Sequence, residues 1–197
     1  MLSLTLITTN MTPKLQKIAI TGHTAGLGES LFKHFLHQGY SIEGFSRSNG
    51  YDLSTSEGLQ QLVKKVGSCD IFINNAYSGW AQIDLLYQMF EQWKPQPKHI
   101  INISSNSGDG IKNFMHPYAV QKTALDKASE QLNAILEAKC RVTNLRPGWL
   151  DTERVSKLKV TDPKISLQEM ATLIEWIVCL PKTLHISTMS MTAREWP

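Results

Sequence analysis

The sequence has few features that would tie it to a metal, a membrane or a nucleic acid. Its three cysteines and six histidines follow no metal-ligand spacing. No apolar run approaches the length of a membrane span, and the first ten residues lack the basic start of a signal peptide. The net charge of +3 comes without a long run of lysines and arginines. We therefore expect no metal site, no membrane association and no nucleic-acid partner.

The composition is that of an ordinary globular protein. At 197 residues with 42% hydrophobic residues, the chain suits one domain with a single sizeable core. We assign this domain to residues 17–197 and treat residues 1–16 as an N-terminal extension, for which a disordered state is one alternative. Cys69, Cys140 and Cys179 each lie in or beside an apolar segment, which predicts buried free thiols in a reducing cytoplasm.

Short apolar runs alternate with helical patterns along the whole chain. This alternation predicts an α/β fold, a Rossmann-type doubly wound sheet of about seven mostly parallel strands with helices on both faces. The longest expected helix uses Leu125 and Leu136 in its packing stripe. The expected strands cover residues 17–21, 40–45, 51–53, 70–76, 98–104, 141–146 and 184–191, and the expected helices cover about 26–38, 56–66, 81–93, 117–138 and 167–180.

A glycine cluster follows the first expected strand and opens the first expected helix. The segment runs from Thr21 and Gly22 to Gly26, Leu27 and Gly28. Glycines let a tight turn approach a phosphate closely, and the following helix offers free N–H groups and its positive dipole end. This arrangement predicts a dinucleotide pyrophosphate site.

The second expected strand ends at Ser46 and Arg47, with no carboxylate beside them. In dinucleotide folds an acidic residue at this place binds the ribose 2′-hydroxyl, whereas a basic residue accommodates a 2′-phosphate. We therefore expect NADP(H) to be preferred over NAD(H). The alternative is that Arg47 is an ordinary surface residue.

Tyr118 and Lys122 lie four residues apart, which places them on one face of a helix. A cation beside a phenol favours the phenolate and lowers its pKa, and such a tyrosine can exchange a proton with a carbonyl or alcohol oxygen. Ser105, thirteen residues before Tyr118, follows a buried strand. Its hydroxyl is expected at the carboxyl end of the sheet, where open α/β folds bind ligands.

Together these segments resemble the short-chain dehydrogenase/reductase family over about residues 17–191. The segment from Thr21 to Gly28 is similar to the family's TGxxxGxG loop, and Asn74-Asn75-Ala76-Tyr77 is similar to its NNAG motif. Ser105, Tyr118 and Lys122 match its catalytic serine and YxxxK. Pro147-Gly148, with Thr152 beyond, looks like its PGxxxT turn.

The resemblance implies a role for each matching residue. Tyr118 would be the general acid or base, Lys122 would lower its pKa and bind the nicotinamide ribose, and Ser105 would polarise the substrate carbonyl. It also implies a homodimer or homotetramer. The further cofactor contacts implied are adenine against Asp52 and Leu53, the adenosine side against Asn75 and Ala76, and the nicotinamide side against Pro147, Gly148, Leu150 and Thr152. Asp52 is explained equally well as a plain turn residue that does not contact the cofactor.

Three features depart from the family pattern. No asparagine lies between Asn75 and Asn102, where the family places one in its proton relay; Gln82, Gln88 or bulk water are the candidates to replace it. Tyr77 stands where the family has glycine. The segment after Thr152 is short, whereas in the family this segment covers the substrate.

Two functions follow from the sequence. The first is an NADP(H)-dependent oxidoreductase that acts on a small carbonyl or alcohol substrate. The second is a nucleotide-binding regulatory or scaffold protein that kept this fold and lost most or all turnover.

Overall fold

The computed structural model describes residues 16–194, so nearly all of the expected N-terminal extension lies outside the described residues. One sheet runs through this part of the chain, and its strand pairs are parallel. In the order β2-β1-β3-β4-β5-β6 the chain reverses its direction of winding between β1 and β3. The topological switch point therefore lies between these two strands. The strands are β1 (Lys17–Thr21), β2 (Ser41–Phe45), β3 (Ile71–Asn74), β4 (His99–Ile103), β5 (Arg141–Pro147) and β6 (Thr188–Met191).

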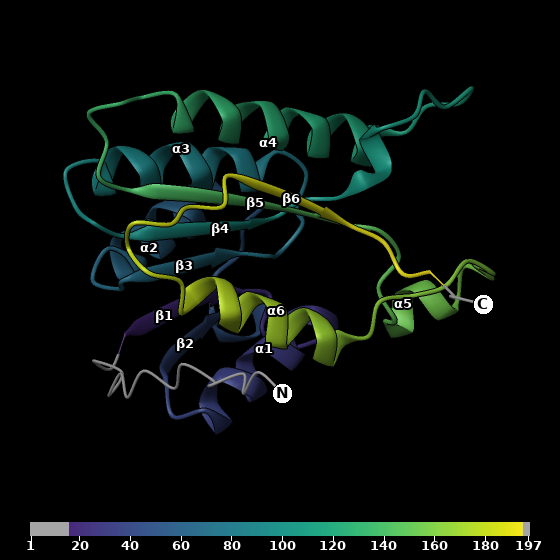
Figure 1. Cartoon of the computed structure of the whole chain (residues 1–197), viewed down its shortest axis with the longest axis horizontal. Coiled ribbons are helices and arrows are strands. Elements are labelled where there is room, and N and C mark those ends of the chain that lie inside the picture. Colours follow the sequence, from purple (N-terminus) through teal and green to yellow (C-terminus); the bar gives the residue numbers. More distant parts are fainter. Residues whose placement is uncertain (1–15, 195–197) are drawn as a thin grey trace, which may run out of the picture.

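Helices cover both faces of the sheet (Figure 1). Two helices, α1 (Gly26–His37) and α6 (Leu167–Val178), pack on one face. The opposite face carries α2 (Ser56–Val66), α3 (Ala81–Trp93) and α4 (Pro117–Asn133). Beyond one edge of the sheet lie the short α5 (Glu153–Ser156) and the loop before α4, as Figure 1 shows. Two single turns, η1 (Arg47–Asn49) and η2 (Asn106–Gly108), follow β2 and β4.

The sheet separates two apolar cores, as the apolar periodicity predicts. Leu27, Leu31 and Phe35 form the inward stripe of α1, and all three are buried. Every residue of β3 and β4 is buried, because helices cover both of their faces. The predicted doubly wound α/β fold is therefore confirmed.

The sheet has six strands within residues 16–194 rather than about seven, because the expected strand at 51–53 does not form. The Asp52 carboxylate instead accepts hydrogen bonds from the backbone N–H and the hydroxyl of Ser54, at 2.9 and 2.8 Å. This local turn competes with strand pairing. Leu53 still packs into the core, which explains why the segment looked strand-like in sequence.

Two further expectations about burial are wrong. The helix α4 ends at Asn133 rather than near residue 138, so Leu136 lies beyond it and is 95% exposed. Cys69 and Cys140 are buried free thiols as expected, but Cys179 is exposed at the end of α6.

Candidate functional site

The predicted site residues come from the carboxyl ends of β1 to β5 and from the loops and helices that follow these ends. In a parallel sheet these ends share one edge, so residues far apart in sequence meet there. Within residues 16–194 no cluster of histidine, cysteine and acidic side chains could hold a metal ion, and no helix is long and apolar enough to span a membrane.

The turn after β1 is closely packed around its glycines. Gly22 and Gly26 adopt φ values of +73° and +54°, a region that side chains rarely enter. A Cβ on Gly28 would stand 2.0 Å from the carbonyl oxygen of Gly22. The N–H of Gly22 donates to the Phe45 carbonyl at 2.7 Å, which ties the turn to β2. Glycine is therefore required here by geometry.

The start of α1 offers unsatisfied N–H groups to a ligand. Its N-cap residue, Ala25, has no side chain that could accept from the first turn. Leu27 and Gly28 lie in this first turn, and Thr152 lies close to Gly26, since a Cβ there would meet the Thr152 methyl at 3.5 Å. A glycine-lined turn that leads into an uncapped helix fits a dinucleotide pyrophosphate.

The predicted adenosine side is braced by Thr21. The Thr21 hydroxyl accepts from the N–H groups of Asn75 and Ala76 at 3.0 and 2.9 Å, and the Asn75 amide donates to the Thr21 carbonyl at 2.8 Å. These bonds hold the end of β3 against the glycine turn. Asn75 and Ala76 are thus placed beside Gly22, whose Cβ would touch both.

The end of β2 carries the residues predicted to select the cofactor. Ser46 caps the single turn η1, and Arg47 is exposed on that turn. Asp52 is partly exposed, and its hydrogen bonds with Ser54 lower the pKa of its carboxyl. The turn role of Asp52 is therefore present in the structure; the adenine contacts of Asp52 and Leu53 stay predictions.

The three predicted catalytic residues come together. The hydroxyls of Ser105 and Tyr118 interact, and the Lys122 Nζ lies 5.5 Å from the centre of the Tyr118 ring. Burial raises the pKa of Tyr118 above its usual value, and the Ser105 hydroxyl opposes this rise. The expectation of a lowered Tyr118 pKa is therefore not met, because burial outweighs the favourable contacts.

Lys122 is buried on α4, and its ammonium makes two hydrogen bonds. It donates to the Gln82 Oε1 and the Ile103 carbonyl, both at 2.7 Å. Burial lowers the pKa of Lys122 to about 7, and the Asp126 carboxylate one helical turn away opposes this. A charge that is retained in so buried a place can act strongly on neighbouring groups, because screening by water is weak there.

The turn after β5 closes the predicted nicotinamide side. The N–H of Gly148, next to Pro147, donates to the Met191 carbonyl at 2.8 Å. Leu150 pairs with Ile165, so this segment is held between α6 and the sheet edge. The Thr152 hydroxyl accepts from the Val155 N–H at 3.2 Å and caps α5.

Two contacts beside the catalytic trio were not assigned from sequence. Tyr77, noted only as a departure from glycine, packs edge-on against Tyr118 with ring centres 4.9 Å apart and lies 5.8 Å from the Lys122 Nζ. Gln82 is buried against Lys122, whereas Gln88, the other candidate, is exposed. The sequence signal that pointed to Gln82 was its position on the apolar face of the expected helix 81–93.

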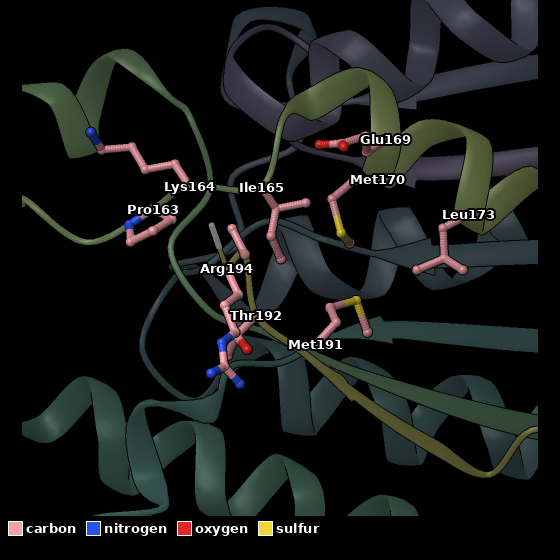
Figure 2. A pocket seen from close by; sticks show the side chains of 10 residues that line it. Pro163, Lys164, Ile165, Glu169, Met170, Leu173, Met191, Thr192 and Arg194 are labelled. Carbon is pink, nitrogen blue, oxygen red and sulfur yellow. The ribbon is translucent and has the colours of Figure 1, made fainter. Parts of the chain in front are cut away.

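The described residues also form a pocket of about 650 Å³ away from the trio (Figure 2). It lies between residues 163–165, α6 and residues 191–194, and none of the predicted site residues lines it. Four large apolar side chains that flank the predicted site motifs in sequence are exposed: Trp80, Phe114, Met115 and Trp149.

The sequence has relatives among known proteins. No family model matches the sequence. Dehydrogenase/reductase SDR family member 11 of Mus musculus is 28% identical over 216 aligned residues, covering 82% of each chain. The human protein of the same name is 24% identical and covers 89% of this chain and 93% of the relative. The fold, the ordered motifs and these relatives all match the short-chain dehydrogenase/reductase family.

Solved structures agree with this match at the level of fold. A short-chain dehydrogenase from Burkholderia cenocepacia in complex with NADP superposes with a TM-score of 0.78, at 20% identity and 91% and 89% coverage of the two chains. The 3-alpha-hydroxysteroid dehydrogenase of a Pseudomonas species, complexed with NADH, gives 0.75, at 18% identity and 89% and 94% coverage. Members of this fold group thus bind either cofactor.

Proposed function

We propose that this chain is an NADP(H)-dependent oxidoreductase that interconverts a small carbonyl compound and its alcohol. The observation that carries the proposal is the convergence of Ser105, Tyr118 and Lys122 beside the glycine turn. A protein that only bound a nucleotide would have no chemical need for all three side chains. The names of the sequence relatives, which are dehydrogenases, reductases and oxidoreductases, support the same class of activity.

The residues present fit a nicotinamide dinucleotide. The turn from Gly22 to Gly28 and the uncapped start of α1 would hold the pyrophosphate, and Arg47 would face a 2′-phosphate. When bound, such a cofactor supplies or accepts the hydride. Pro147, Gly148 and Thr152 would border the nicotinamide end of this site.

The protein's own contribution is proton transfer and orientation. Ser105 would hydrogen-bond the substrate oxygen and orient it toward Tyr118. The Tyr118 hydroxyl would donate its proton to the carbonyl oxygen in reduction and remove it from the alcohol in oxidation. The Lys122 charge, 5.5 Å from the ring centre, favours the phenolate in both directions.

A carbonyl panel with NADPH consumption as the readout tests the activity. The proposal predicts consumption with at least one small aldehyde or ketone. NADPH binding without consumption across a broad panel would favour the nucleotide-binding scaffold instead. The raised Tyr118 pKa is the observation on that side.

The cofactor preference is tested separately by fluorescence titration. We expect NADPH to bind at least about tenfold more tightly than NADH, because one well-placed cation on a phosphate contributes on the order of 1.4 kcal/mol or more. Arg47→Ala should remove most of this difference. Lys33→Ala, on the exposed part of α1, is the control that should retain it. Tighter NADH binding by the unaltered protein would contradict the preference.

A further inference from the structure

We propose that Gln82 is a positioning residue, which holds the Lys122 ammonium beside the Tyr118 ring through a fixed side-chain amide. The kinetic consequence of this contact rests on the proposed function, whereas the contact itself does not. Gln82 lies in the first turn of α3, forty residues from Lys122, and is only 3% exposed.

The orientation of the Gln82 amide is determined by its surroundings. Its Nε2 donates to the Asn74 carbonyl at 2.8 Å and to the Ile103 carbonyl at 3.3 Å. The oxygen must then face Lys122, whose Nζ donates to it at 2.7 Å. A flipped amide would set its N–H groups against the ammonium and its oxygen against two carbonyls, which removes every one of these bonds.

A second set of hydrogen bonds fixes the position of Gln82 itself. The Asn74 side chain donates to the Gln82 carbonyl at 2.8 Å and to the Asn102 Oδ1 at 3.0 Å. Asn102 in turn donates to the Ser129 hydroxyl on α4 at 3.0 Å. The amide is therefore tied to β3, to β4 and, through them, to the helix that carries Lys122. A buried network of this kind leaves the ammonium little freedom to move.

Because Gln82 is neutral, it does not offset the effect of the Lys122 charge on the Tyr118 hydroxyl. The titratable groups that face Lys122 are Tyr77 and Tyr118, at the ring distances given above, with Asp126 and Arg154 acting in opposite directions on its charge. A carboxylate in place of Gln82 would cancel the positive charge at the site. The amide instead satisfies the ammonium by hydrogen bonding and leaves its charge to act on Tyr118.

The first test is a direct measurement on Lys122 by nitrogen-15 NMR of the lysine ammonium groups, with the signal assigned by its loss in Lys122→Met. We expect ammonium protons protected from exchange and a nuclear Overhauser contact to the Gln82 side chain. Gln82→Met, of similar volume but without the acceptor, should lower the measured pKa of Lys122 by about one unit or more. Gln88→Met, on the exposed side of the same helix, is the matched control and should leave it unchanged.

The second test follows the pH dependence of alcohol oxidation, because that direction needs the Tyr118 phenolate. Gln82→Met should move the acidic limb of kcat/KM to higher pH by about one unit, while the binding of NADPH changes little. An unchanged Lys122 pKa and an unchanged limb would overturn the inference. If Gln82→Met does not fold, the absence of the Overhauser contact in the unaltered protein would overturn it equally. If no substrate is turned over, the proposed function fails while the NMR result still decides the role of Gln82.

Discussion

The two ends of β4 bury titratable side chains in contrasting ways. His99 begins the strand at the amino end, where its Nε2 shares a hydrogen bond with the Thr143 hydroxyl at 2.8 Å. Lys122 approaches the carboxyl end and donates to the Ile103 carbonyl and to Gln82. Burial lowers the pKa of His99 to about 3 and that of Lys122 to about 7.

The difference lies in what each site does with a charge. The Thr143 hydroxyl donates to the Ile186 carbonyl, so it accepts from the His99 Nε2–H. The buried His99 Nδ1 has no partner among the described residues for the second N–H that an imidazolium would carry. Lys122 has two oxygen acceptors and lies over two aromatic rings, which stabilise an ammonium. Burial therefore opposes the charged form at both ends, and the ends differ in their acceptors: only Lys122, where the predicted chemistry takes place, has two oxygen acceptors for its charged form.

The largest effect on the carboxyl end is expected from Gly28→Ala. The new Cβ would stand 2.0 Å from the Gly22 carbonyl oxygen, so the turn must open. We expect a loss of about 1–3 kcal/mol in the free energy of unfolding, and at least about a tenfold weaker binding of NADPH. Denaturant unfolding and fluorescence titration measure the two quantities.

Gly110→Ala is the matched control for this substitution. No atom lies within 4 Å of its ideal Cβ, and the residue does not need a positive φ. Both measured quantities should stay close to those of the unaltered protein. If Gly28→Ala behaved in the same way as this control, the proposed phosphate turn would be wrong.

An effect confined to stability at acidic pH is expected from His99→Leu at the amino end. In the unaltered protein the unfolded chain binds a proton near pH 6.5, while folded His99 stays neutral down to about pH 3. Its contribution to stability is therefore complete above pH 6.5 and is lost as the pH falls, at up to about 1.4 kcal/mol per pH unit. The variant should lose stability less steeply between pH 6.5 and 4.

Denaturant unfolding at several pH values measures this slope for both proteins. Turnover near neutral pH should be the same for the variant and the unaltered protein, because His99 lies far from the carboxyl edge of β4. A slope that is equal in the two proteins would show that His99 is not held neutral. A large loss of turnover would contradict the division of roles between the two ends.

Features that depend on residues close together in the sequence could be predicted from it. The apolar stripe of α1 and the glycines of the first turn follow from short-range spacing, and the structure confirms both. The segment 51–53 was misread as a strand because Leu53 is buried there without belonging to the sheet. Leu136 was misplaced because the end of α4 at Asn133 has no strong sequence signal.

The sequence predicts which residues belong to the candidate site, but it does not predict which side chains they contact. Ser105, Tyr118 and Lys122 were recognisable from their order, whereas the choice of Gln82 over Gln88 depends on which face of α3 meets α4. The raised pKa of Tyr118 also depends on burial by segments distant in sequence, including the ring of Tyr77. Such contacts arise only from the packing of the whole domain.

In the proposed mechanism, proton transfer at the carboxyl end of the sheet passes through Tyr118. The most direct measurement is single-turnover oxidation of NADPH by the carbonyl substrate, with the unaltered protein and with Tyr118→Phe. We predict that the variant reacts at least about 100-fold more slowly, as expected for the loss of a general acid, and binds NADPH with nearly the same Kd. An unchanged rate in Tyr118→Phe would contradict the claim.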